Sequence, residues 1–166
     1  KSHAQSGVGA LEQRRHEPVN VLIFHPVRLP PKNYGGVERV VLWLARGLRD
    51  RGHRVTVAAH PASRLPEGVE LWPVPPEQAA DSNLLRPEAK VRLEKFEAVH
   101  FMAPPAEGVM VQLPCASLLT VHGNGKPGER FPKNTVFLSA DHARRHDSSA
   151  YVYNGLDPDE LRFNPD

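Results

Sequence analysis

The chain has 166 residues, of which 40% are hydrophobic, and a formal net charge of +2 at pH 7. This length suits one globular domain, and the composition supports one hydrophobic core. Acidic and basic residues are interspersed without long runs of like charge, so the charge gives no argument for nucleic-acid binding. Cys115 is the only cysteine, which excludes an internal disulfide framework. No apolar stretch reaches the roughly 20 residues of a membrane span.

The N-terminal part of the sequence predicts a strand–helix–strand unit. Val19–Phe24 is a short, nearly continuous apolar run, which is typical of a parallel strand covered on both faces. After the loop His25–Gly35, apolar residues recur at helical spacing through Val37–Leu48, and Gly52 ends the predicted helix. Arg54–Ala59 is the second predicted strand. This spacing predicts a right-handed parallel crossover.

The rest of the chain continues the alternation of strands and helices. The further predicted strands are Val69–Val74, Ala98–Met102, Ala116–Val121, Thr135–Leu138 and Ala150–Tyr153, and the further predicted helices are Pro87–Phe96, Ala106–Gln112 and Ala140–Arg145. Alternating elements of this length predict an α/β fold, a single Rossmann-like domain with a doubly wound parallel sheet. Lys1–Pro18 is polar and shows no periodicity, so we expect a flexible lead there.

The loop before the first predicted helix is the first candidate ligand site. Open α/β sheets bind ligands beyond the carboxyl ends of their strands. Gly35 and Gly36 allow close approach of the backbone, and the free N–H groups of the helix start favour an anion such as phosphate. A tight turn without a ligand is the alternative. The chain contains neither GxGxxG nor a Walker A loop, which disfavours NAD binding and a P-loop NTPase.

The second candidate site follows the predicted strand Ala116–Val121. His122 and Gly123 lie at its carboxyl end, where a histidine can donate to a substrate oxygen or simply anchor the loop. A metal site is disfavoured: His142 and His146 are four residues apart, but HExxH and an obvious third ligand are missing. The absence of a GxSxG elbow disfavours a serine hydrolase.

Taken together, these residues resemble the N-terminal domain of GT-B glycosyltransferases of family 4. The motifs match the family in order and spacing, and their combination is more specific than any one of them. The segments that carry the resemblance are Val21–Phe24, Tyr34–Val41, Leu44–Val57, Glu97–His100, Leu119–Gly123 and Tyr153–Asp157.

The resemblance implies a retaining glycosyltransferase. Such an enzyme transfers a sugar from a nucleotide-sugar donor to a glycan, lipid or small-molecule acceptor, without a metal or other cofactor. Residues 19–153 correspond to the acceptor-side GT-B domain, and residues 154–166 to the start of the crossover into a second domain. The lone cysteine and the absence of a long apolar stretch favour a cytoplasmic setting, and the charge pattern gives no nucleic acid as partner, with peripheral membrane contact left open.

The resemblance also implies roles for individual residues. His122 matches a histidine that contacts the transferred sugar and is the predicted catalytic residue. Gly35 and Gly36 match the loop that approaches the donor diphosphate and the acceptor. The other residues carried over are Tyr34, Glu38 and Gly123 in the substrate and donor-phosphate loops, and Asn154 and Gly155 in the interdomain crossover.

Several of these residues have a plain structural alternative. Tyr34 stacks on a sugar or merely caps its loop. Glu38 orients the loop or only complements the dipole of the helix. Asn154 and Gly155 mark the crossover or an ordinary turn. Basic residues around the loop Gly123–Pro132 meet an anionic acceptor or a lipid phosphate, or are simply solvated.

We expect the chain to be half of an enzyme. In the family, the donor domain carries the nucleotide pocket and two glutamates eight positions apart, and this sequence contains no glutamate pair with that spacing. A helix terminus contributes only about 0.3–1 kcal/mol, whereas millimolar binding needs about 4 kcal/mol. We therefore expect no transfer without a C-terminal donor-binding domain. The alternatives are a stand-alone glycan- or nucleotide-binding domain and, disfavoured by the missing GxGxxG, a small oxidoreductase.

Overall fold

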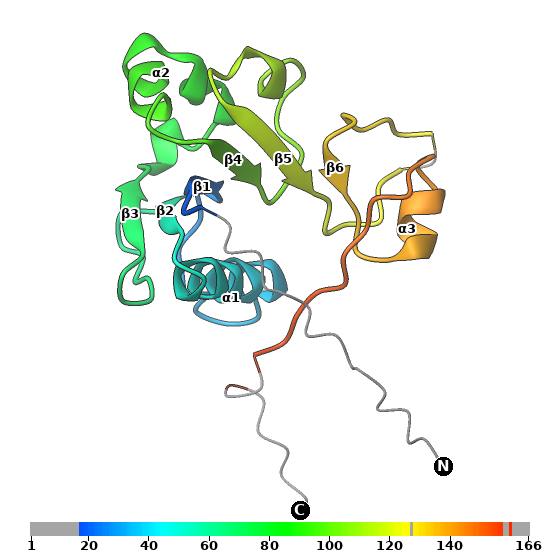
Figure 1. Cartoon of the computed structure of the whole chain (residues 1–166), viewed down its shortest axis with the longest axis horizontal. Helices are drawn as coiled ribbons and strands as arrows, with labels where there is room; N and C mark the ends of the chain where they lie inside the picture. Colours follow the sequence, from blue (N-terminus) through cyan, green and yellow to red (C-terminus); the bar gives the residue numbers. More distant parts are fainter. Residues whose placement is uncertain (1–16, 127, 158–159, 161–166) are drawn as a thin grey trace, which may run out of the picture.

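The sheet of this protein has six strands in the order β3-β2-β1-β4-β5-β6 (Figure 1). The computed structural model describes residues 17–126, 128–157 and 160. Every neighbouring pair of strands is parallel, which confirms the predicted Rossmann-like α/β domain. The strands are β1 (Asn20–Phe24), β2 (Arg54–Ala59), β3 (Glu70–Pro73), β4 (Ala98–Phe101), β5 (Ala116–Thr120) and β6 (Thr135–Val136).

Among the described residues, three α-helices and three short 3₁₀ helices accompany these strands, and all but α3 lie between strands. They are α1 (Gly36–Asp50), α2 (Pro87–Leu93), α3 (Ala140–Arg144), η1 (Pro76–Gln78), η2 (Asp81–Leu85) and η3 (Met110–Gln112). α1 begins and ends where its sequence predicts. Glu38 lies in its first turn, Arg49 in its last, and Gly52 has the left-handed φ of 88° that favours glycine after a helix.

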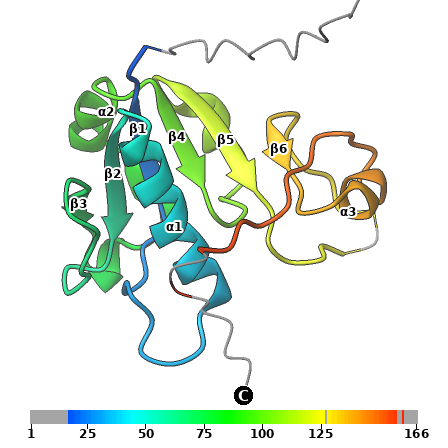
Figure 2. The same ribbon diagram turned by 60° about the horizontal axis from the view of Figure 1, so that its bottom comes forward.

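Each face of the sheet has its own hydrophobic core. Because side chains alternate along a strand, Leu22 and Phe24 of β1 point to one face, and Val21 and Ile23 to the other. The first face packs against α2 and α3, and the second against α1. Figure 2 shows α1 lying along its face of the sheet.

The strand order changes direction at β1. The chain runs from β1 outward through β2 and β3, then returns to β4, which pairs with the other side of β1. Adjacent loops leave β1 and β4 in opposite directions at such a point and open a crevice beyond the carboxyl ends of the strands. The fold therefore places the most favourable ligand position at the ends of β1, β4 and β5.

Two predicted elements are wrong. Residues 150–153 form no strand, and only Tyr151 makes an isolated bridge, to Phe137. The side chains of Tyr151–Tyr153 are exposed, so no burial of side chains stabilises a longer strand pairing. The predicted helix Ala106–Gln112 is reduced to η3, because Gly108 has a left-handed φ of 78° that interrupts a helix.

Smaller differences concern the segment before β4. The segment between β3 and α2, for which no helix was predicted, contains η1 and η2. α2 ends at Leu93 rather than Phe96, since the N–H of Phe96 donates to the carbonyl of Leu93 in a tighter turn. Residues 1–16 of the predicted lead and residues 158–159 and 161–166 of the predicted crossover lie outside the described residues. None of the helices described has both the length and the apolar character of a membrane span.

Candidate functional site

A cavity of about 760 Å³ lies beside α1, over the ends of β4 and β5. We call it the histidine cavity. α1, the two strands and the segment after Tyr151 all contribute to its wall. Its lining includes Trp43, Arg46, His100, Thr120, His122 and Asn154.

His122 occupies the position that the sequence predicts for it. β5 ends at Thr120, the N–H of Val121 still donates to the carbonyl of Val136, and His122 follows at the carboxyl edge of the sheet. Its side chain is half-buried and lines the histidine cavity. Its Nε2 atom is buried and has no hydrogen-bond partner among the described residues. A buried imidazole nitrogen without a partner is rare unless a ligand or water completes it.

Two further histidines, which were not among the predicted site residues, lie near His122. His25 directly follows β1, and His100 lies in β4, the strand between β1 and β5 in the sheet. The Nε2 atom of His100 is 2.8 Å from the Oγ1 of Thr120. All three histidines are at or near the carboxyl ends of strands. Their shared position at strand ends is a sequence feature that could have identified them as candidate site residues. The order of the strands, which makes them neighbours, cannot be predicted from a local sequence pattern.

Burial holds these histidines neutral. Burial, together with the smaller effect of the nearby His122, lowers the pKa of His100 to about 4. Burial, followed by the proximity of His25, also lowers the pKa of His122. Burial lowers the pKa of His25, against which Glu38 acts in the opposite direction. A neutral imidazole has one N–H donor and one acceptor nitrogen, so His122 can donate to or accept from a sugar hydroxyl near pH 7.

Trp43 supplies a second unpaired donor to the histidine cavity. Its Nε1 atom is buried and has no partner within the described part of the chain. An indole N–H can only donate. The cavity therefore presents polar groups suited to a ligand that carries oxygen acceptors.

The predicted glycine loop does not line this cavity. Gly35 is buried, and a Cβ there would lie 2.5 Å from the Cβ of Pro31 and 2.8 Å from the Oε2 of Glu38. Gly36 is exposed at the start of α1, and Tyr34 is 97% exposed. Gly35 is therefore explained by close packing, whereas Gly36 leaves the helix start open to an approaching group. Glu38 lies close enough to His25 to act on its pKa.

The residues after β5 and at the predicted crossover divide between the cavity and solvent. Gly123 is exposed, and no atom lies within 4 Å of a Cβ built there. Asn154 and Gly155 line the histidine cavity. Arg46 of α1 holds the segment that carries them through an ion pair with Asp157, and Figure 2 shows this segment crossing α1.

His142 and His146 belong to an aromatic cluster on the other side of the domain. His146 stacks on Phe137, with ring centroids 5.2 Å apart, and Phe131 meets it edge-on. The Nδ1 of His146 lies 3.1 Å from the carbonyl of Glu129, and its Nε2 lies 3.2 Å from that of Asn124. These contacts join α3 to the loop after β5. Among the residues described, no group of three or more His, Cys, Asp or Glu side chains is arranged to hold a metal ion.

Comparison with known proteins assigns the chain to a family. The family model described as Glycosyltransferase Family 4 matches residues 34–157, well over half of the chain. The matched range contains α1, His100, His122 and the segment that closes the histidine cavity. A search of curated proteins found no match. The chain therefore belongs to Glycosyltransferase Family 4, in which it forms a glycosyltransferase N-terminal domain.

Proposed function

We propose that this domain is the acceptor-binding half of a retaining glycosyltransferase. It works with a donor-binding domain of the same family to transfer a sugar from a nucleotide sugar to a glycan, lipid or small-molecule acceptor. The single observation that supports this most is His122: its neutral imidazole lies at the switch-point edge of the sheet and presents a buried Nε2 without a partner in the described chain.

The chemistry we assign to His122 is hydrogen bonding to the transferred sugar. A neutral imidazole can hold a hydroxyl oxygen in place while the bond to the leaving nucleotide breaks, without adding a charge to the site. His100 and Thr120 position the end of β5 from which His122 projects, because they join β4 to β5 just before it. In this proposal no metal or other cofactor takes part.

The donor diphosphate is proposed to meet the N-terminus of α1. α1 is 15 residues long, and Gly36 at its start is exposed and carries no side chain. Free backbone N–H groups and the positive end of the helix dipole favour a phosphate at this position. Tyr34, also exposed, lies two residues before Gly36 and is proposed to contact the donor or the acceptor.

A second domain is proposed to be required for transfer. The helix terminus alone contributes about 0.3–1 kcal/mol, far below the about 4 kcal/mol of even millimolar binding. Sugar transfer also requires that bulk water be excluded from the reacting centre, which in two-domain enzymes follows from closure. His122 and Gly36 are proposed to face that closing domain.

Combining the two domains tests this proposal. The purified chain is mixed with a separately expressed C-terminal donor domain of Family 4, with a panel of nucleotide sugars and simple glycoside acceptors. We expect acceptor-dependent nucleotide release only when both domains are present, and a product that keeps the anomeric configuration by NMR. Transfer by the chain alone would contradict the need for a second domain. Sustained inactivity of two folded domains would contradict the enzymatic proposal.

The second candidate function is a glycan- or nucleotide-binding domain without catalysis. The histidine cavity favours it, because this chain alone forms a cavity of about 760 Å³ in which Trp43 Nε1 and His122 Nε2 have no hydrogen-bond partner among the described residues. Calorimetric titration with nucleotide sugars and glycans separates the two functions. Saturable binding that remains without transfer beside a donor domain supports the binding module and not the enzyme.

A further inference from the structure

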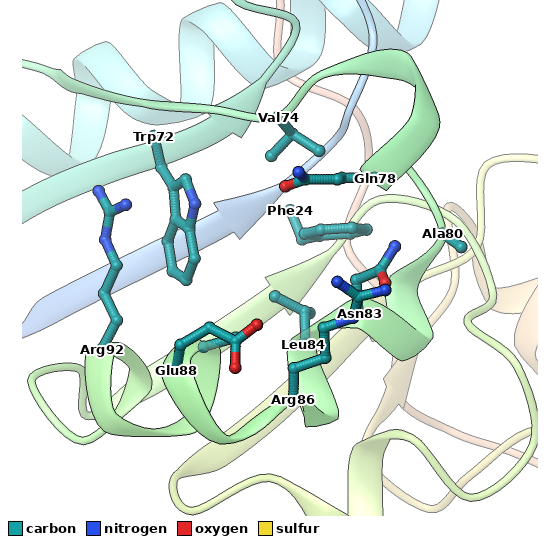
Figure 3. Close-up of a pocket in the computed structure, with 11 residues that line it drawn as sticks. Phe24, Trp72, Val74, Gln78, Ala80, Asn83, Leu84, Arg86, Glu88 and Arg92 are labelled. Carbon is teal, nitrogen blue, oxygen red and sulfur yellow. The ribbon is translucent and has the colours of Figure 1, made fainter.

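A second cavity, of about 430 Å³, lies on the opposite face of the sheet from α1. We call it the Trp72 cavity. It is formed by the ends of β1 and β3, the 3₁₀ helices η1 and η2, and the first turns of α2, and it shares no lining residue with the histidine cavity. Its volume is in the range of small-molecule sites. Figure 3 shows its side chains converging from these elements.

The floor of the Trp72 cavity is apolar and fixed. Phe24, Val74 and Leu84 line it, and each belongs to the buried core on this face. The ring of Phe24 packs against that of Phe101, with centroids 5.7 Å apart. A floor built from core side chains does not have to be ordered when a ligand arrives, which lowers the cost of binding.

The side chain of Trp72 closes one end of the cavity, and neighbouring side chains fix its position. The guanidinium of Arg92 lies over its ring, 3.9 Å from the centroid, and the ring of Phe96 stacks near it at 6.5 Å. Burial lowers the pKa of Arg92, against which Glu70 acts in the opposite direction. Arg92 is therefore already engaged by the protein.

The polar side chains around the floor are, by contrast, not used by the protein. The side chains of Gln78, Asn83, Arg86 and Glu88 line the cavity, and none makes a hydrogen bond or ion pair within the described part of the chain. Figure 3 shows Gln78 beside the Phe24 ring, with Asn83 and Arg86 across the cavity from Trp72. η2, which carries Asn83, is tied down because the carboxylate of Asp81 accepts from the N–H of Ala106 at 2.9 Å.

The combination of these groups selects the class of ligand. Arg86 can only donate hydrogen bonds, an ionised Glu88 can only accept them, and the amides of Gln78 and Asn83 do both. Because Arg92 is engaged by Trp72 and Glu70, Arg86 and Glu88 are the charges left at the rim, and an ion of either sign would be repelled by one of them. Hydroxyl groups both donate and accept, so a neutral polyol satisfies all four side chains. The apolar floor beneath them includes the aromatic ring of Phe24, which can contact the C–H face of a pyranose ring.

We propose that the Trp72 cavity is a binding site for the pyranose ring of a neutral saccharide. The ring lies with its C–H face on Phe24 and Leu84, and its hydroxyls bond to Gln78, Asn83, Arg86 and Glu88. The site goes beyond the proposed glycosyl transfer: it requires no donor, no second domain and no contact with His122.

The two tryptophans of the chain make the proposal directly testable. Trp43 lines the histidine cavity and Trp72 lines this one. In ¹H–¹⁵N spectra of the full chain, methyl α-D-glucopyranoside, methyl α-D-mannopyranoside and methyl β-D-galactopyranoside are titrated in turn while both indole N–H signals are followed. We expect at least one sugar to shift the Trp72 signal saturably, with a Kd of about 1–10 mM, and to leave Trp43 in place.

Charged sugars and matched variants complete the experiment. Glucuronic acid and glucosamine are expected to bind more weakly than the neutral sugar. Glu88→Lys is expected to weaken neutral-sugar binding about tenfold, since it removes an acceptor bonded to a hydroxyl. Glu94→Lys makes the same charge change on an exposed residue just beyond α2 that does not line the cavity, and is expected to leave binding unchanged.

Three results would overturn the site. They are a shift of Trp43 instead of Trp72, no shift of Trp72 up to about 100 mM of every neutral sugar, and equal effects of the two lysine variants. Tighter binding of glucuronic acid or glucosamine than of any neutral sugar would overturn the ligand class. Loss of glycosyl transfer in the two-domain assay would leave these measurements untouched, so the two proposals fail independently.

Discussion

The Nε2 atom of His100 and the Oγ1 atom of Thr120 lie 2.8 Å apart and join β4 to β5 two residues before His122. Thr120 is buried, and His100 is half-buried in the wall of the histidine cavity. A neutral imidazole satisfies this contact, whereas a protonated one would place a charge beside His122 in a poorly solvated position. The stability of the domain is therefore tied to the protonation of His100.

Acidification is expected to destabilise the domain between pH 6.5 and about 4. Burial holds the pKa of His100 at about 4, against an ordinary value of 6.5. Between these two pH values the unfolded chain therefore binds more protons than the folded domain. Lowering the pH shifts the equilibrium toward the unfolded chain, and the free energy of unfolding falls by on the order of 3 kcal/mol at the lower end. Urea unfolding at a series of pH values measures this. His100→Asn should lose less stability than the wild type on acidification, and an unchanged pH dependence would contradict the assignment.

Replacing His122 with asparagine is expected to reduce transfer in the two-domain assay by about 10²–10³-fold, because a hydrogen-bond donor to the reacting sugar is misplaced. The measurement is kcat with a nucleotide sugar and acceptor. His60→Asn is the control, because His60 follows β2 as His122 follows β5 but does not line the histidine cavity. Equal losses in both variants would indicate a general effect on folding.

Gly35→Ala is expected to lower the free energy of unfolding by about 1–3 kcal/mol, since its Cβ would overlap the ring of Pro31. Gly36→Ala is the matched control. The nearest atom to a Cβ there is 3.8 Å away, and alanine favours the helix by up to about 1 kcal/mol. Urea unfolding of both variants is the test. Equal stabilities would show that the loop before α1 yields to the added methyl group.

Arg46→Met is expected to loosen the segment 152–157 with little change in global stability. Arg46 pairs with Asp157, and its side chain is 36% exposed, so the pair contributes less than about 1 kcal/mol. Hydrogen exchange should be faster in this segment only. Arg144→Met removes a more exposed arginine–aspartate pair, with Asp141 on α3, and should leave the segment's exchange unchanged. Unchanged exchange in Arg46→Met would show that other contacts hold the segment.

The sequence by itself determined the elements whose stability is local. α1 is predictable because its apolar stripe, first-turn Glu38 and terminal Gly52 all act within one segment. β1 and β2 are predictable as continuous apolar runs. Predictions fail where burial decides: residues 150–153 are apolar enough for a strand, yet the fold leaves their side chains exposed.

Only the tertiary structure decided which residues share a site. His122 is marked by its strand and its motif, but His25 and His100 become its neighbours only through the order β1-β4-β5. That order depends on contacts between residues far apart in the chain, which no local pattern encodes. The same holds for the Trp72 cavity, whose floor comes from β1, η2 and the residue after β3, and whose polar rim comes from η1, η2 and α2. Local propensity specifies the elements, and the burial of two faces of one sheet brings their side chains together.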